Sequence, residues 1–273
     1  MKGNGGGTPS AAVMEAAADY RWLLDRKYPD QPTIKLVGDR YQLTGVERAM
    51  LFRGVFSESD SRRRASLLVG EHELSTDRGA EDSVLLVDGH NVLFTIWNYL
   101  AGRPMVAGTD GFIRDIGGTH SRLPHDERFT RLARCLCAAL RPVHRSRITV
   151  LLDAPLPWSR EHAAEIARIW NELDDEPPDG GAPTAAVGDR GVTAAVSGAK
   201  SLEVRVEEHV DARVAAAVSG WIATSDTGII DRCSVPVVDL GGYIVRRIFG
   251  AEPVVMTPAN TGAPVTPGDG HRR

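Results

Sequence analysis

The chain has 273 residues, enough for two domains or for one domain with additions, and its 42% hydrophobic and 25% charged residues exclude a disordered or fibrous protein. Its net charge of -4 excludes a strongly basic protein, so a nucleic-acid partner would need a local basic surface. No apolar run is long enough to cross a bilayer and the first residues lack an apolar signal core, so we expect a cytoplasmic protein without a membrane partner.

The chain begins with a glycine-rich segment, residues 1–10, which we expect to be disordered. Residues 11–57 have the pattern of a small unit of three helices. Ser10 can cap the first helix, and Thr44 with Glu47 forms a capping box that starts the third. The sequence therefore predicts a helical N-terminal unit.

This helical unit is rich in arginine, which allows two interpretations. Arginines set between tyrosines and tryptophan are typical of a surface that contacts phosphates and bases. Aspartates and glutamates are interspersed among them, and they favour a solvated face of ion pairs. Residues 58–82, which follow, are polar and predict an exposed linker.

From Val84 onward, short apolar runs alternate with amphipathic stretches, which predicts parallel strands joined by helices. The expected fold of residues 83–250 is therefore α/β, a Rossmann-like and mostly parallel sheet with helices on both faces. The expected strands are residues 84–87, 148–152, 202–206, 221–224 and 235–238. We also expect a glycine-rich loop at 108–122, a low-order insertion at 174–200 and a disordered tail at 251–273.

Cysteine and tryptophan give little functional information. Cys135, Cys137 and Cys233 match neither a disulfide framework nor a zinc site, so we expect free thiols in the core. Trp158 and Trp170 belong to one predicted helical region and are also expected in the core.

Aspartates follow the predicted strands in a repeated way. Asp88, Asp153 and Asp226 each end a strand, and Asp211 lies in the first turn of a predicted helix. Because the carboxyl ends of parallel strands meet at one edge of a sheet, these acids can converge there. Clustered carboxylates repel one another unless a cation holds them, and an all-oxygen set favours Mg²⁺ or Mn²⁺ over zinc. Such ions serve phosphodiester hydrolysis.

Three stretches resemble motifs of the PIN and NYN-like nuclease superfamily. VLLVDGHN (84–91) resembles the opening motif, a strand that ends in an acid followed closely by a small residue and an asparagine. VDARV (210–214) resembles the stretch that carries a third acid, and WIATSDTGIIDR (221–232) resembles the late motif. Over residues 12–57 and 83–249 the chain resembles a family in which a helical DUF434 domain, here with ADYRWLLDRKYP, precedes a PIN-like DUF5616 domain.

The resemblance implies roles for the acids. The metal-binding and catalytic acids would be Asp88, Asp211 and Asp226, with Asp153 as a fourth catalytic acid. The insertion before the third acid blurs the match, so Glu207 and Glu208 are alternatives to Asp211.

The resemblance also implies roles for polar neighbours of these acids. Asn91 would orient the first acid or a water, and Thr224 or Ser225 would position phosphate or the last acid. Arg114 lies in the glycine-rich loop, from which it could contact the substrate or form an ordinary ion pair.

Together these features predict a metal-dependent ribonuclease of PIN-like fold, with RNA as its partner. Two alternatives stay open, a non-catalytic RNA-binding or regulatory protein and a haloacid-dehalogenase-like phosphatase. The phosphatase chemistry needs a second aspartate two residues after the first, where this chain has His90. The sequence leaves the RNA substrate, the cleavage mode and the oligomeric state open.

Overall fold

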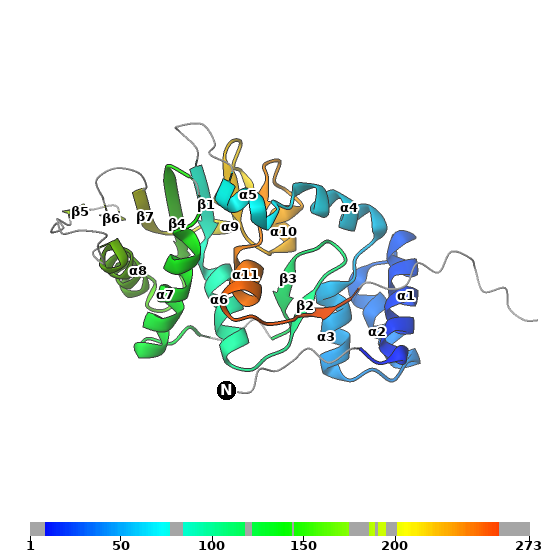
Figure 1. Cartoon of the computed structure of the whole chain (residues 1–273). Coiled ribbons are helices and arrows are strands. Elements are labelled where there is room, and N and C mark those ends of the chain that lie inside the picture. Colours follow the sequence, from blue (N-terminus) through cyan, green and yellow to red (C-terminus); the bar gives the residue numbers. More distant parts are fainter. Residues whose placement is uncertain are drawn as a thin grey trace, which may run out of the picture.

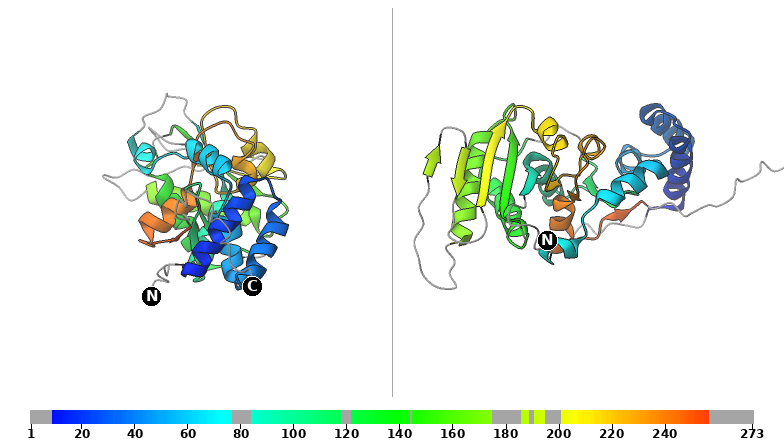
Figure 2. Two further views of the ribbon diagram at one scale, coloured as in Figure 1. Left: turned by 90° about the vertical axis from the view of Figure 1, so that its right-hand side faces the viewer. Right: turned by 90° about the horizontal axis from the view of Figure 1, so that it is seen from above.

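A computed structural model of the chain describes residues 9–76, 84–117, 122–143, 145–174, 186–188, 191–194 and 201–256. Figure 1 shows two bodies side by side, a β-sheet with its helices and a group of N-terminal helices. The same separation is visible from above in Figure 2. The α/β class, the mostly parallel sheet and the run of helices before it are confirmed.

The N-terminal unit consists of α1 (Ala11–Asp25), α2 (Asp30–Arg40) and α3 (Gly45–Gly54). Ser10 caps α1, because its hydroxyl accepts a hydrogen bond from the N–H of Val13 at 3.3 Å. Thr44 and Glu47 form the predicted capping box, in which each side chain accepts from the other residue's N–H, at 3.3 and 2.8 Å. Tyr20 and Leu51 fill the core between these helices.

Ion pairs cover the surface of this unit. Arg48, for example, lies 3.0 Å from the carboxylate of Asp39, and Arg40 lies 3.7 Å from that of Asp19. Arg26 stacks on the ring of Trp22 instead. The arrangement agrees with a solvated, ion-paired face rather than a bare basic surface.

The segment predicted as a linker, residues 58–82, instead forms two helices in its described part. They are α4 (Glu58–Leu67) and α5 (Glu71–Thr76). Ser57 caps α4 by accepting from the N–H of Asp60 at 3.1 Å. These helices lack the apolar stripe by which a helix is recognised in a sequence. Side-chain caps and ion pairs stabilise them instead.

The most buried of these ion pairs joins α4 to the second body. Arg64 is only 6% exposed, and its guanidinium donates to both carboxylate oxygens of Asp231 at 2.7 and 2.8 Å. Asp110 lies 3.6 Å away on the same guanidinium. Although partial burial raises it, the hydrogen bonds from Arg64 and Arg63 hold the pKa of Asp231 below its ordinary value.

A small second sheet lies between the two bodies. It consists of β2 (Met105–Ala107), β3 (Ile113–Asp115) and β10 (Val254–Val255), in the order β10-β2-β3. The predicted loop at 108–122 therefore contains a strand, and the tail expected to be disordered from 251 first forms another. The reason is burial, because Val254 and Met256 pack into the core of the N-terminal helices together with Val106.

The five predicted strands of the main sheet are present. They are β1 (Val84–Asp88), β4 (Arg147–Asp153), β7 (Ser201–Glu207), β8 (Trp221–Ala223) and β9 (Val237–Val238). They run parallel in the order β7-β4-β1-β8-β9. The antiparallel strands β5 (Ala186–Gly188) and β6 (Gly191–Ala194) extend the sheet beyond β7. Most of the insertion at 174–200, and residues 1–8 and 257–273, lie outside the described residues.

Helices cover both faces of this sheet, as predicted. One face carries α6 (Gly89–Leu100), α7 (Glu127–Leu140) and α8 (Ser159–Asp174), and the other carries α9 (Val210–Ala215) and α10 (Thr227–Ile230). Leu85 and Val87 pack on the first face and Leu86 on the second, as alternation along a strand requires. After β9 the chain continues through α11 (Leu240–Tyr243) and the π-helical turn η1 (Ile244–Ile248).

Trp158 is not the core residue that was expected. Trp170 is 1% exposed within α8, but Trp158 is 50% exposed. The helix begins at Ser159, so Trp158 precedes it and lies outside its buried stripe. The three cysteines are free thiols, with Cys137 and Cys233 buried and Cys135 half-buried. No helix in the described part of the chain combines the length and apolar character needed to span a membrane.

Replacing Arg64 tests whether its ion pairs hold the two bodies together. Arg64→Met should lower the free energy of unfolding by about 3 kcal/mol, because it removes a cation from the fully buried carboxylate of Asp110 and also from Asp231, which is 39% exposed. Urea unfolding followed by circular dichroism measures the change.

Arg62→Met is the matched control on the same helix. The Arg62 side chain is 79% exposed and pairs with Glu58 within α4, so its loss should cost about 0.5 kcal/mol or less. Equal costs for the two variants would contradict a structural role for the buried pair.

Candidate acidic site at the carboxyl edge of the sheet

The structure brings the four predicted aspartates to one edge of the main sheet. β1 lies between β4 and β8, and Asp88 and Asp153 are the last residues of β1 and β4. Asp226 follows β8 as the N-cap of α10. Asp211 lies in the first turn of α9, which packs against β1, β4 and α10.

Asp88 is the most buried of these acids, with 3% of its surface exposed. Its Oδ1 accepts the N–H of Asn91 at 3.3 Å, and its Oδ2 accepts the hydroxyl of Thr224 at 2.9 Å. Burial raises the pKa of Asp88 to about 7 against the lowering effect of these hydrogen bonds. The negative charges of Asp153 and Asp211 raise it further.

Polar side chains tie the ends of β1 and β8 together. The side-chain oxygen of Asn91 accepts both the N–H and the hydroxyl of Ser225, at 2.9 and 3.1 Å. Thr224, while donating to Asp88, accepts the N–H of Asp226 at 3.1 Å. Thr224 therefore links Asp88 to Asp226, and Asn91 fixes Ser225 beside them, while their roles toward a phosphate or a water stay predictions.

Asp211 and Asp226 have exposed side chains at the mouth of this edge. Partial desolvation raises the pKa of Asp211, and the charges of Asp226 and Asp153 raise it further, with Arg232 opposing them. The edge thus concentrates negative charge around the buried Asp88 carboxyl.

Asp211 and the neighbouring glutamates Glu207 and Glu208 have different surroundings. Glu207 is half-buried at the end of β7 and pairs with Arg213 at 3.3 Å, while Glu208 is exposed. The carboxylates that raise the pKa of Asp88 are those of Asp153 and Asp211. The electrostatic effect on Asp88 favours Asp211, and the identity of the third metal-binding acid stays a prediction.

His90 is a component of the edge that the strand-end pattern did not assign. It is 3% exposed, and its Nδ1 accepts the N–H of Asp153 at 2.8 Å and lies 2.9 Å from Oδ2 of the same residue. Its Nε2 is buried without a hydrogen-bond partner among the residues that the structure describes. The contact joins residues 63 positions apart, so no local sequence signal could have revealed it.

Arg114 lies behind the site, not over it. It is 2% exposed, its terminal nitrogens donate to the carboxylate of Asp110 at 2.9 and 2.8 Å, and its Nε donates to the carbonyl of Ser225 at 2.8 Å. Of the two roles left open for Arg114, the structure shows the ion pair. The cause is β3, which turns the predicted loop inward and makes Arg114 a support for the Ser225 backbone.

The residues present fit a hard divalent cation by their donor chemistry. Carboxylate oxygens are the preferred ligands of Mg²⁺ and Mn²⁺, and an uncompensated carboxyl such as Asp88 is stabilised by a cation. Within the described ranges, no three His, Cys, Asp or Glu side chains are already drawn together as a metal-binding group. Closure around an ion would therefore require Asp211 and Asp226, the exposed pair, to turn inward.

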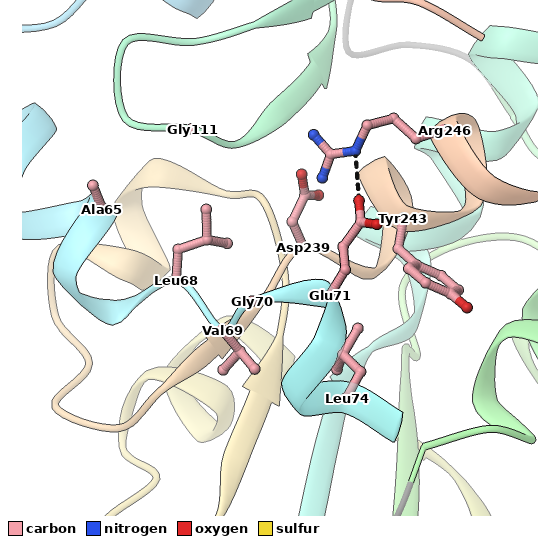
Figure 3. Close-up of a pocket in the computed structure, with 10 residues that line it drawn as sticks. All are labelled: Ala65, Leu68, Val69, Gly70, Glu71, Leu74, Gly111, Asp239, Tyr243 and Arg246. Atoms are coloured by element: carbon pink, nitrogen blue, oxygen red, sulfur yellow. Dashed lines mark hydrogen bonds and ion pairs between the residues drawn. The ribbon is translucent and has the colours of Figure 1, made fainter. Parts of the chain in front are cut away.

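A separate pocket of about 420 Å³ lies beside the site, between α5, the turn at Gly111 and α11. In Figure 3 the side chains of Arg246 and Glu71 meet across it, and Asp239 lines the same pocket. Burial raises the pKa of Asp239, while the N–H groups of Ile113 and Gly242 bind its carboxylate and lower it. These bonds give Asp239 a structural role, and none of the four clustered aspartates lines the pocket.

Comparisons with known proteins agree with the order of segments expected from the sequence. The family model described as "Protein of unknown function (DUF434)" matches residues 12–66, and "Domain of unknown function (DUF5616)" matches residues 78–176. The second match includes Asp88 and Asp153 but ends before Asp211. An uncharacterized protein of Methanocaldococcus jannaschii, MJ0935, is 20% identical over 155 residues, which are 57% of this chain and 71% of that protein. No solved structure gives a significant match.

Asp88→Asn should stabilise the metal-free protein at neutral pH. Because the folded-state pKa of about 7 lies above the ordinary value of 3.8, the wild type loses stability as the pH rises between these values. Asparagine does not titrate, so the free energy of unfolding of the variant, relative to wild type, should rise by about 2–4 kcal/mol from about pH 4 to about pH 8. Urea unfolding in EDTA across this range measures it.

Asp126→Asn is a control in which the expected effect on stability at neutral pH has the opposite sign. Hydrogen bonds from Arg128 lower the pKa of Asp126, so wild-type stability from this group is present above its ordinary pKa and is lost as the pH falls. That variant should be less stable than wild type at neutral pH. Parallel pH curves for Asp88→Asn and wild type would contradict the burial account of Asp88.

Proposed function

We propose that this chain, in which a DUF434 segment precedes a DUF5616 segment, is a metal-dependent ribonuclease that hydrolyses RNA phosphodiesters. The observation that carries the proposal is the environment of Asp88. The carboxyl of Asp88 is 3% exposed, and burial together with two further carboxylates raises its pKa to about 7. Ionisation of such a group destabilises the folded protein. Perturbed groups of this kind concentrate at functional sites.

Asp88, Asp211 and Asp226 would hold the cation. When bound, Mg²⁺ or Mn²⁺ would neutralise charge at the attacked phosphate and lower the pKa of a water. Thr224 fixes the rotamer of Asp88 through its hydroxyl, and the same hydroxyl fixes the backbone of Asp226. Asp153, whose backbone N–H donates to Nδ1 of His90, is the remaining carboxylate that can accept a proton at this edge.

The N-terminal unit supports the site through its last connection. Asp226 caps α10, and Asp231, the residue after α10, is bound by Arg64 of α4. The position of the capping acid therefore depends on a contact made by the helix that leaves the N-terminal unit.

RNA is the proposed partner of the acidic edge.

A second candidate is a non-catalytic RNA-binding protein of the same fold. It is favoured by one observation, that no ready-made metal-binding group exists among the described side chains. A dehalogenase-like phosphatase is not proposed, because the position that would need its second aspartate holds His90, which is buried and bonded to Asp153.

Cleavage assays test the proposal. Purified protein should cleave RNA in Mg²⁺ or Mn²⁺ and not in EDTA, and Asp88→Asn and Asp226→Asn should each lower the rate by about 100-fold or more, because each removes a proposed ligand of the ion. A broad panel of single-stranded and structured RNAs, resolved on denaturing gels, is the measurement.

Asp126→Asn is again the matched control, because Asp126 is an exposed acid that caps α7 and is not among the proposed metal ligands. Its rate should equal that of wild type. Residual cleavage that is the same in wild type and Asp88→Asn would show a contaminating nuclease and contradict the proposal.

Calorimetry distinguishes the two candidates. For a nuclease, Mn²⁺ should bind the wild type, and Asp226→Asn should weaken that binding by about 10-fold or more, because a charged ligand is lost. For the non-catalytic candidate, RNA binding should fall with salt and be indifferent to Asp226→Asn. Salt-dependent RNA binding that Asp226→Asn leaves unchanged would favour the non-catalytic protein over the nuclease.

A further inference from the structure

An exposed aromatic pair consists of Trp158, on the loop that follows Asp153, and His125, just before α7. The rings of Trp158 and His125 are stacked, with centroids 4.2 Å apart and planes 5° from parallel. Trp158 is 50% exposed although a tryptophan is usually well covered, and His125 is exposed as well. One face of the indole is thus backed by His125 while much of the ring stays open to solvent.

The loop holds Trp158 at a backbone cost. Its φ is +67°, a left-handed conformation that is uncommon for a bulky aromatic residue. The hydroxyl of Ser159 donates to the carbonyls of Asp153 and Leu156, at 2.6 and 2.8 Å, and closes the loop on itself. The carbonyl of Trp158 accepts the N–H of His162 at 2.8 Å. Strain that a structure retains in this way is typical of functional positions.

A buried layer of rings supports the pair from below. His162 is 1% exposed and stacks on Phe129 with centroids 3.8 Å apart, and its ring lies 6.0 Å from that of His125. Burial lowers the pKa of His162 to about 4, so this ring is neutral near pH 7. The exposed pair therefore rests on packed neutral rings rather than on a flexible loop.

The loop connects this pair directly to the acids. Trp158 is five residues after Asp153, whose carbonyl receives the Ser159 hydroxyl and whose carboxylate raises the pKa of Asp88. Arg160, in the first turn of α8, is exposed beside it. The open indole face of Trp158 suits the base of a nucleotide, and the guanidinium of Arg160 suits its phosphate.

We propose that Trp158, backed by His125, is a stacking platform for an unpaired base of the RNA that the acidic site binds. The inference rests on the proposed function and specifies its substrate as single-stranded. Every base offers a face for stacking, so the platform selects unpaired strands over duplexes without selecting a sequence. On the N-terminal helices, Arg26 covers one face of the exposed Trp22.

Binding measured without cleavage tests the platform. Full-length Asp226→Asn protein in EDTA is titrated into a labelled single-stranded oligoribonucleotide, with fluorescence anisotropy as the readout. Adding Trp158→Ala should weaken binding by about 10-fold to 100-fold, and Trp158→Phe, which keeps a ring, by about 3-fold or less. Binding of a duplex RNA of equal length should change much less.

Trp22→Ala is the matched control, because Trp22 is 52% exposed and has one face covered by Arg26. It should leave the affinity unchanged. Trp158→Gly separates folding from binding, since glycine adopts a positive φ without strain. It should unfold at a temperature at least as high as Trp158→Ala and still lose affinity.

The possible results separate this inference from the proposed function. Equal affinities for Trp158→Ala and Trp22→Ala, or equal losses for single-stranded and duplex RNA, would overturn the platform even if metal-dependent cleavage is found. Trp158-dependent binding of single strands, without any metal-dependent cleavage, would support the platform and overturn the nuclease.

Discussion

The burial of one carboxyl group at the end of the central strand is the constraint on which the rest of the site depends. Asp88 ends β1 and is covered by helices of both faces, so its pKa rises to about 7. Its oxygens are held by the Thr224 hydroxyl and by the first turn of α6. Thr224 in turn fixes the backbone of Asp226, so the orientation of one buried acid sets the position of a second, exposed one.

A chain of buried ion pairs extends this constraint to the N-terminal unit. Arg114 binds the Ser225 carbonyl and the carboxylate of Asp110, and Arg64 of α4 reaches both Asp110 and Asp231. Buried charges of this kind are costly unless each is paired, so the arrangement tolerates few substitutions. The helices before the sheet are thereby joined to the edge that carries the acids.

The parts predicted from the sequence are those with a local signal. The strands of the parallel sheet appear as apolar runs, the capping box of Thr44 and Glu47 as a fixed spacing, and three of the four aspartates as residues at strand ends. The parts that were missed depend on distant contacts. α4 is held by Arg64 and Asp231, 167 positions apart, β10 pairs with β2, and His90 bonds to Asp153 across 63 positions. The role of Arg114 stayed open in the sequence because a glycine-rich loop gives no sign of the strand β3, which turns its side chain inward.

The central claim is that the clustered aspartates bind a divalent cation. A crystal of the full chain soaked in Mn²⁺ tests it most directly, because the anomalous signal of manganese locates the ion without reference to any activity. The account predicts one strong peak within ligand distance of Asp88, Asp211 and Asp226, with the side chains of Asp211 and Asp226 turned toward Asp88. Manganese bound only elsewhere, or an acidic edge unchanged at saturating Mn²⁺, would contradict it.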